Sequence, residues 1–82
     1  MTQFEKMMLA IRTEKFLSQM YDEIDKSSAK GLESLVFELQ GEHTLDLAIN
    51  IANNFARNTN ILSCDVECIE GVYHLYVTWE NK

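Results

Sequence analysis

The sequence contains no proline, and it has no low-complexity stretch, no internal repeat and no segment with the composition of a linker. Nothing divides the 82 residues, so we expect residues 1–82 to form a single domain. Hydrophobic residues make up 46% of the chain and charged residues 24%. These proportions are typical of globular proteins and exclude an intrinsically disordered chain.

Long apolar runs are absent as well. The longest run near the start is "MMLAI", residues 7–11, and the acidic Glu5 lies just upstream of it. A membrane span needs about 20 apolar residues and the core of a signal peptide about 7–15, so this run is too short for either. We therefore expect a cytoplasmic protein that has no segment to be cleaved and does not bind membranes.

The sequence also lacks the motifs of common active sites, namely the nucleophile elbow, the P-loop, the dinucleotide fingerprint and the zinc-protease motif. It holds only two cysteines and two histidines, and their spacing does not match a four-ligand zinc site. In a chain that is not exported, two cysteines are typical of free thiols rather than of a disulfide framework. We expect a protein that is not an enzyme and that holds neither a cofactor nor a metal.

Basic side chains become scarce after residue 30. Residues 1–30 hold five basic and five acidic residues, whereas the basic residues of 31–82 are only Arg57 and Lys82. The eight acidic residues of the same segment are Glu33, Glu38, Glu42, Asp46, Asp65, Glu67, Glu70 and Glu80. The whole net charge of −6 therefore lies in residues 31–82. A surface of this sign repels nucleic-acid phosphates and anionic lipids, and it attracts a protein partner with a basic surface.

The first predicted element is a helix that runs to about Lys26. Thr2 can cap its first turn while Glu5 reaches back, which is a capping box. Its apolar side changes direction by about 150° along the helix. The two groups of apolar residues are Phe4, Met7, Met8 and Ile11, and then Phe16, Leu17, Met20, Tyr21 and Ile24. Either the helix breaks near residues 12–15, with Thr13 as a second cap, or one helix contacts two partners. The first group then either wraps the core or meets another protein or a second copy of this chain.

Residues 32–40 fit two kinds of secondary structure. At helical spacing, their apolar residues form a stripe that ends at Gly41, a typical helix stop. At a period of two, one face of a strand carries Leu35, Phe37 and Leu39. An isolated two-stranded hairpin is only marginally stable, so a third strand in residues 34–40 is the favoured interpretation.

The next segment, "HTLDLAINIANNFARNTN", predicts a helix that Thr44 caps and residues 58–60 end. Helical spacing places the following apolar residues on its inward side: Leu45, Ala48, Ile49, Ala52, Phe55 and Ala56. Asparagines and Arg57 occupy the outward side.

The last predicted element is a hairpin that turns at Glu70 and Gly71. With this turn, one face carries only apolar or thiol side chains, in the pairs Cys68 with Tyr73, Val66 with Leu75, Cys64 with Val77 and Leu62 with Trp79. A three-residue loop would shift the register by one residue and mix polar with apolar side chains on each face, which a buried face penalises strongly. Glutamate is not a favoured first residue of the two-residue turn, but the pattern of the faces outweighs this.

The two cysteines lie on the apolar face of this hairpin. Four residues along one strand separate Cys64 from Cys68 by about 13 Å, whereas a disulfide needs Cα atoms within about 7 Å. His74 projects from the other face and cannot join them. Both thiols are therefore predicted to be buried apolar side chains rather than metal ligands or redox groups.

The opposite face of the hairpin is polar. It places Glu67 opposite His74 and Asp65 opposite Tyr76, close enough for cross-strand contacts. A carboxylate beside an imidazole is either an acid–base pair or, far more commonly, a solvated ion pair. We interpret this face as a docking surface for a basic partner, made of Asp65, Glu67, Glu70, Glu38, His74 and Tyr76.

Together these elements predict an α+β fold of order α-β-α-β-β. A three-stranded antiparallel sheet of residues 34–40, 61–69 and 72–80 would carry two helices on one face. If residues 32–40 are helical instead, three helices precede the hairpin, and this order resembles the winged helix-turn-helix family, with Gly41 at the turn and residues 62–79 as the wing. The resemblance implies DNA binding. Residues 44–80 contain one basic side chain, Arg57, so the phosphate contacts of such a reader are missing.

For function, these features predict a small acidic module that binds another protein and catalyses nothing. One concrete form is a phage or mobile-element inhibitor that occupies the basic surface of a nucleic-acid-binding host enzyme, such as a defence nuclease. Small size, acidity and missing catalytic motifs favour it by analogy. The alternatives are a structural homodimer assembled through Phe4, Met7, Met8 and Ile11, and a winged-helix reader of DNA.

Overall fold

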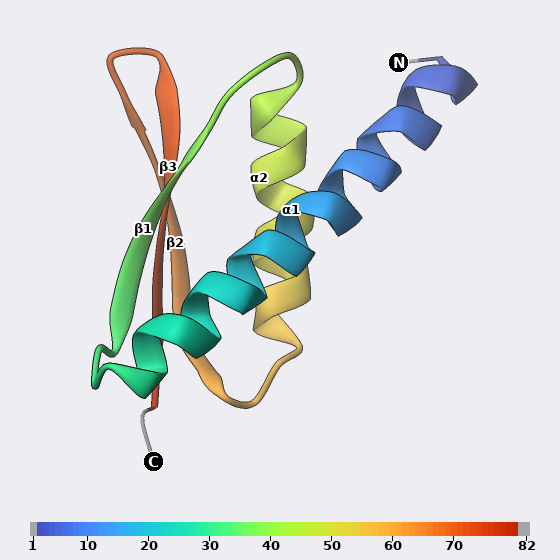
Figure 1. Cartoon of the computed structure of the whole chain (residues 1–82). Coiled ribbons are helices and arrows are strands. Elements are labelled where there is room, and N and C mark those ends of the chain that lie inside the picture. Colours follow the sequence, from blue (N-terminus) through green and yellow to red (C-terminus); the bar gives the residue numbers. More distant parts are fainter. Residues whose placement is uncertain (1, 81–82) are drawn as a thin grey trace.

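The computed structural model describes residues 2–80, which form two helices and three strands. In chain order these are α1 (Gln3–Ala29), β1 (Ser34–Leu39), α2 (Thr44–Ala56), β2 (Ile61–Ile69) and β3 (Val72–Trp79). Both helices lie on the same face of the sheet (Figure 1). The predicted α+β fold is confirmed. The winged-helix order is wrong, because the segment that would supply its extra helix is β1.

The strands form an antiparallel sheet in the order β1-β3-β2, so β3 is central and the other two strands form the edges. Residues 34–39 pair with β3 along their whole length, which settles the ambiguous segment as a strand. With a neighbour on each side, β3 is the most enclosed strand of the sheet. Leu75 and Val77 are 0% exposed, and Trp79 is 4% exposed.

The predicted two-residue turn joins β2 to β3. Glu70 and Gly71 both have positive φ, 51° and 79°, which is the backbone of a primed turn that matches the right-handed twist of the strands. Three of the predicted pairs are present, namely Cys68 with Tyr73, Val66 with Leu75 and Cys64 with Val77. The fourth pair is wrong. A bulge at Leu62 leaves Ile61 opposite Trp79 and turns the Leu62 side chain outward, where it is 65% exposed.

The first helix is continuous. Thr2 and Glu5 form the predicted capping box. The helix does not break near residues 12–15, because the Thr13 hydroxyl donates to the Leu9 carbonyl one turn earlier instead of capping a second helix. It ends at Ala29, three residues beyond the predicted end. Among residues 2–80, no helix is both long enough and apolar enough to cross a membrane.

The second helix is rotated relative to the prediction. His43 precedes it with a φ of 55° and no side-chain cap, so Thr44 is the first helical residue and not the cap. The buried residues of α2 are Leu47, Ala48, Ile51 and Phe55. Leu45 and Ile49, both predicted to face inward, are 48% exposed. Sequence periodicity shows that about half of the circumference of α2 is apolar. Which part of this apolar half is buried depends on α1 and β2, between which α2 packs.

The core lies between the sheet and the two helices. Phe55 is 0% exposed, and its ring meets the Tyr21 ring of α1 edge to face, with centroids 5.1 Å apart. The other buried core residues are Leu17, Met20, Ile24, Leu39, Leu47, Ala48, Ile51, Leu75, Val77 and Trp79. The buried residues that α1 gives to this core all lie in its second half, and from its first half Leu9 packs against the core. The first half of α1 projects beyond α2 (Figure 1).

Candidate protein-interaction surfaces

The face of the sheet that carries no helix, which we call the outer face, gathers most of the predicted docking residues. Strands β1 and β2 both pair with β3, so side chains opposite one another line up across all three strands. One row consists of Glu38, His74 and Glu67. The next row consists of Val36, Tyr76 and Asp65. The structure therefore brings five of the six predicted residues together, and Glu70 lies at the adjacent turn.

His74 is held at the centre of its row. Its Nε2 lies 3.3 Å from the Glu38 carboxylate, and its Nδ1 lies 3.0 Å from the Val72 carbonyl oxygen. The His74 side chain is 15% exposed, and that of Glu38 is 59% exposed. This contact of His74 therefore joins β3 to β1, whereas the sequence predicted Glu67 of β2 as the partner of His74.

Glu67 instead contacts Tyr76, its diagonal neighbour on β3. The pKa of the Tyr76 hydroxyl is raised above its ordinary value, chiefly by desolvation and then by the charge of Glu67 and a hydrogen bond with it. The phenol consequently stays protonated and donates to the carboxylate.

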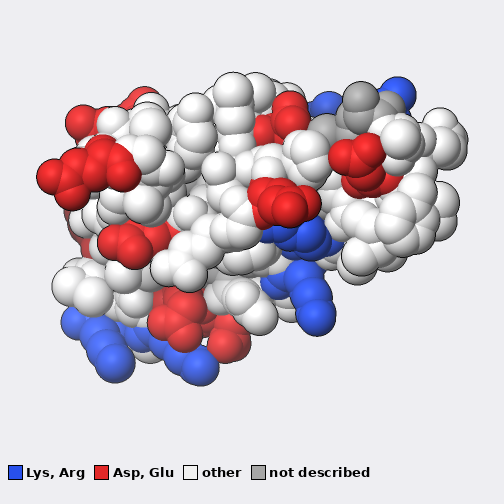
Figure 2. Space-filling view, turned by 90° about the horizontal axis from the view of Figure 1, so that it is seen from above, with Lys and Arg blue, Asp and Glu red and all other residues white. Residues whose placement is uncertain are grey.

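The charge of the sheet is of one sign. No lysine or arginine occurs in β1, β2 or β3. The carboxylates of the strands, those of Glu38, Asp65 and Glu67, all belong to the outer face, and all three residues are exposed. In Figure 2, acidic atoms gather at the end of the molecule where the sheet lies. The outer face can form ion pairs and accept hydrogen bonds from a basic surface.

The cysteines lie on the other side of the sheet, as predicted, but they are not equally buried. Cys64 is half-buried, and desolvation, helped by the nearby Asp65, raises the pKa of its thiol to about 11. Cys68 is exposed, so the prediction that both thiols are buried is wrong. In Figure 1, the turn of the hairpin, which Cys68 precedes by two residues, lies beyond the start of α2. Within residues 2–80, no group of three or more His, Cys, Asp or Glu side chains is placed to hold a metal ion.

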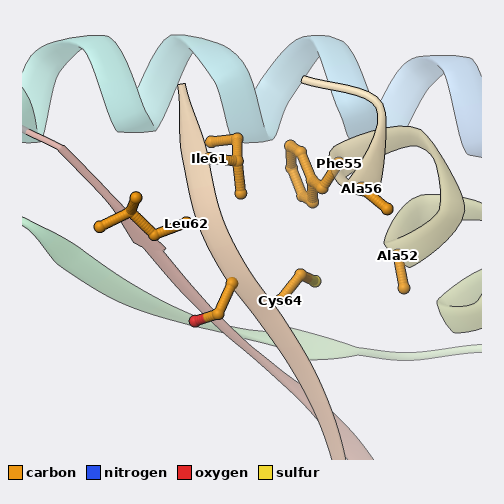
Figure 3. Close-up of a pocket in the computed structure, with 7 residues that line it drawn as sticks. Ala52, Phe55, Ala56, Ile61, Leu62 and Cys64 are labelled. Atoms are coloured by element: carbon orange, nitrogen blue, oxygen red, sulfur yellow. The ribbon is translucent and has the colours of Figure 1, made fainter. Parts of the chain in front are cut away.

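A hollow of about 260 Å³ lies between α2 and the start of β2 (Figure 3). Ala52, Phe55 and Ala56 line it from the helix, and Ile61 and Cys64 line it from the strand. The small side chains of the two alanines leave this space open. Leu62 is at the rim and points away from the helix in Figure 3, in agreement with the bulge.

The predicted apolar group at the start of α1 is exposed. Phe4 is 69% exposed, Met7 59%, Met8 44% and Ile11 52%. These side chains lie on the side of α1 opposite its buried residues. They form an apolar patch on the part of the helix that projects from the molecule, which we call the α1 patch.

Sequence reasoning missed the contact that attaches this projecting half to the rest of the molecule. Arg12 donates to the backbone carbonyls of Glu42 and Gln40, in the connection between β1 and α2. Glu5 contacts His43 in the same connection, with Oε2 and Nε2 3.2 Å apart. A lone arginine among the polar residues of a helix gives no signal of this role, because its acceptors are backbone atoms.

Comparisons with protein-family models, with curated proteins and with solved structures find no match to this chain.

Proposed function

We propose that this protein is a non-enzymatic module that binds a basic surface of another protein through the outer face of its sheet. The observation that carries the proposal is the grouping of Glu38, Asp65 and Glu67 on one helix-free face of a sheet that contains no lysine or arginine. Such a face holds no lysine or arginine that would neutralise its carboxylates, so its field extends to an approaching partner.

A specific form of this proposal is that the partner binds nucleic acid through the same basic surface. A carboxylate-lined face then competes with phosphates for the same arginines and lysines. In this form the module acts as an inhibitor, as expected for a phage or mobile-element protein directed at a host nuclease. Adding the purified chain to the captured partner should release the nucleic acid of that partner in a filter-binding assay.

The test of the docking face is capture from the native cell with charge-reversed baits. The bait variant carries Asp65→Lys, Glu67→Lys and Glu70→Lys, and the matched control carries Glu14→Lys, Glu23→Lys and Asp25→Lys on exposed positions of α1. Both triple variants change the net charge equally. A partner retained by the wild type and the control, but lost by the outer-face variant, supports the proposal. Equal retention by all three baits rules it out.

The α1 patch favours a second candidate, self-association of the chain. Four large apolar side chains in two turns of a projecting helix are a typical helix–helix contact, and methionines adapt well to such packing. Sedimentation velocity of Met7→Lys against Ser18→Lys tests it. Both variants add one lysine to the outward side of α1, but only the first is within the patch. Self-association predicts a dimer for the wild type and Ser18→Lys, and a monomer for Met7→Lys. A monomeric wild type eliminates this candidate.

A further inference from the structure

We propose that the free edge of β2 accepts an extended segment of the partner as a fourth strand, and that this segment alternates basic with apolar side chains. The inference rests on the function proposed for the outer face and names the kind of segment that binds there. It joins three features of β2: its open edge, the carboxylates on one side of it and the exposed apolar side chains on the other.

The edge of β2 is open. Within residues 2–80, β2 pairs only with β3, and with nine residues it is the longest strand. The N–H and C=O groups on the unpaired side of an edge strand are a template for another extended chain. The bulge at Leu62 disturbs the start of this edge, so the regular part runs over residues 63–69.

The outer side of the edge selects basic side chains. Asp65 and Glu67 are both exposed, and a residue directly opposite on an added strand would lie about 5 Å away. Lysine or arginine at alternate positions of the added strand would therefore form cross-strand ion pairs. A second copy of this chain does not fit. Two fully overlapped antiparallel β2 strands would place Asp65 opposite the same residue of the other copy, and like charges directly opposite are destabilising.

The inner side of the edge selects apolar side chains. Val66 and Cys68 face the helix layer but are only partly covered, with Val66 39% exposed. In Figure 1, α2 runs antiparallel to β2, and Ala52 faces β2 across the hollow. One and two turns before Ala52, on the same side of α2, are Ile49 and Leu45, each 48% exposed. Apolar residues of an added strand would be covered by these side chains of α2.

The other edge of the sheet lacks these features. β1 has six residues and one carboxylate, Glu38, which is already paired with His74. Its inner side chains are Leu35, Phe37 and Leu39, which pack against the core. An added strand at β1 would therefore find no exposed apolar side chain on the inner side to cover.

The experiment titrates the isotope-labelled full chain with synthetic nine-residue peptides and follows amide exchange by NMR. The first peptide alternates lysine with valine, and the second has the same composition with all lysines in one block and all valines in another. The third and fourth have the alternating sequence with backbone N-methyl groups on every second residue, on the odd-numbered residues in one and on the even-numbered residues in the other. We expect only the unmethylated alternating peptide and one of the two N-methylated peptides to bind. Exchange should slow at every second amide of residues 63–69 and stay unchanged at the amides of β1, because an added strand engages alternate amides of one edge.

The variant Asp65→Lys with Glu67→Lys should bind the alternating peptide at least about tenfold more weakly, whereas Glu23→Lys with Asp25→Lys should bind it like the wild type. Failure of the alternating peptide to bind, or binding without protection of β2 amides, overturns the inference. Equal binding of the block peptide does so as well. None of these results contradicts the proposed function. That proposal is wrong only if the bait with the three outer-face lysine substitutions still retains the cellular partner.

Discussion

Phe55 is the residue at which three elements of this protein meet. It is 0% exposed, its ring contacts Tyr21 of α1, and it lines the hollow against β2. Helical spacing in the sequence predicts that it faces inward, and it does. Leu62, predicted to be equally inward, is 65% exposed because of the bulge. At the scale of the residue, an apolar identity therefore does not predict burial where a bulge turns the side chain outward.

Phe55→Ala is therefore expected to destabilise the protein by about 3–5 kcal/mol, because it removes a fully buried ring and leaves a cavity. Leu62→Ala should cost less than about 0.5 kcal/mol, since its side chain is mostly in solvent. Urea unfolding followed by circular dichroism measures both. Equal losses for the two variants would contradict the packing described for α2 and β2.

The two thiols are expected to differ strongly in reactivity. Only the thiolate reacts, and with a pKa of about 11 the thiol of Cys64 is about 0.1% ionised at pH 8, whereas Cys68 is exposed. Raising the pH towards 11 should increase the rate at which the Cys64 thiol is modified about tenfold per pH unit. Ellman's reagent applied to the native variants Cys64→Ser and Cys68→Ser measures each thiol alone. A Cys64 thiol that reacts as fast as Cys68 at pH 8 would contradict its burial.

At the scale of the element, the hairpin combines a strong pattern with an unfavourable turn residue. The alternation of side chains on β2 and β3 determines the register, and the backbone then holds Glu70 at a φ of 51°, which side chains other than glycine and asparagine rarely adopt. The register was predictable because a slip of one residue would expose a whole apolar face. The strain at Glu70 follows from that register.

Glu70→Asn should therefore stabilise the protein by about 1 kcal/mol, because asparagine tolerates this backbone conformation and glutamate does not. If the outer face docks a basic partner, the same substitution should also weaken capture of that partner, since it removes a carboxylate beside the docking face. Thermal unfolding and the capture assay give the two readouts. A lower melting temperature would show that the Glu70 side chain makes a stabilising contact at the turn.

The connection between β1 and α2 depends on α1 rather than on its own sequence. Gly41 has a φ of 100°, and a Cβ added there would lie 2.9 Å from Nη2 of Arg12. The glycine thus permits both the turn and the close approach of the guanidinium that binds the carbonyls on either side of it. Sequence patterns indicate a stop at Gly41, but not the arginine that comes from a helix 29 residues earlier.

At the scale of the whole molecule, stability is unevenly distributed. The second half of α1, α2 and the sheet share one core. The first half of α1 is attached by Leu9, which packs against this core, and by polar contacts of Glu5, Arg12 and Thr13. A helix end with few buried contacts opens without global unfolding. The projecting end can therefore open while the core stays folded.

Native-state hydrogen exchange should show this gradient. Amides of residues 6–9 are expected to exchange through local fraying, and those around Met20 and Leu75 only through global unfolding. Arg12→Met should speed exchange in residues 6–9 and at Glu42 without changing exchange in β3. If the protein is a monomer, equal exchange rates along the whole of α1 would contradict the predicted increase in protection from its first to its second half. A rise in protection of residues 6–9 with protein concentration would instead indicate self-association through the α1 patch.

The sequence by itself determined the two helices, the register of the hairpin from its turn to Cys64 and Val77, and the separation of charge from apolar side chains on the sheet. These features depend on local periodicity, which is present in any short stretch of chain. The tertiary structure decided which apolar side chains of α2 and of the hairpin are covered by other elements. Leu45, Ile49 and Val66 are exposed although they belong to apolar sides, because coverage depends on where α1 and α2 end relative to the sheet. It also selected Glu38 rather than Glu67 as the partner of His74, since this choice depends on a strand that is distant in sequence.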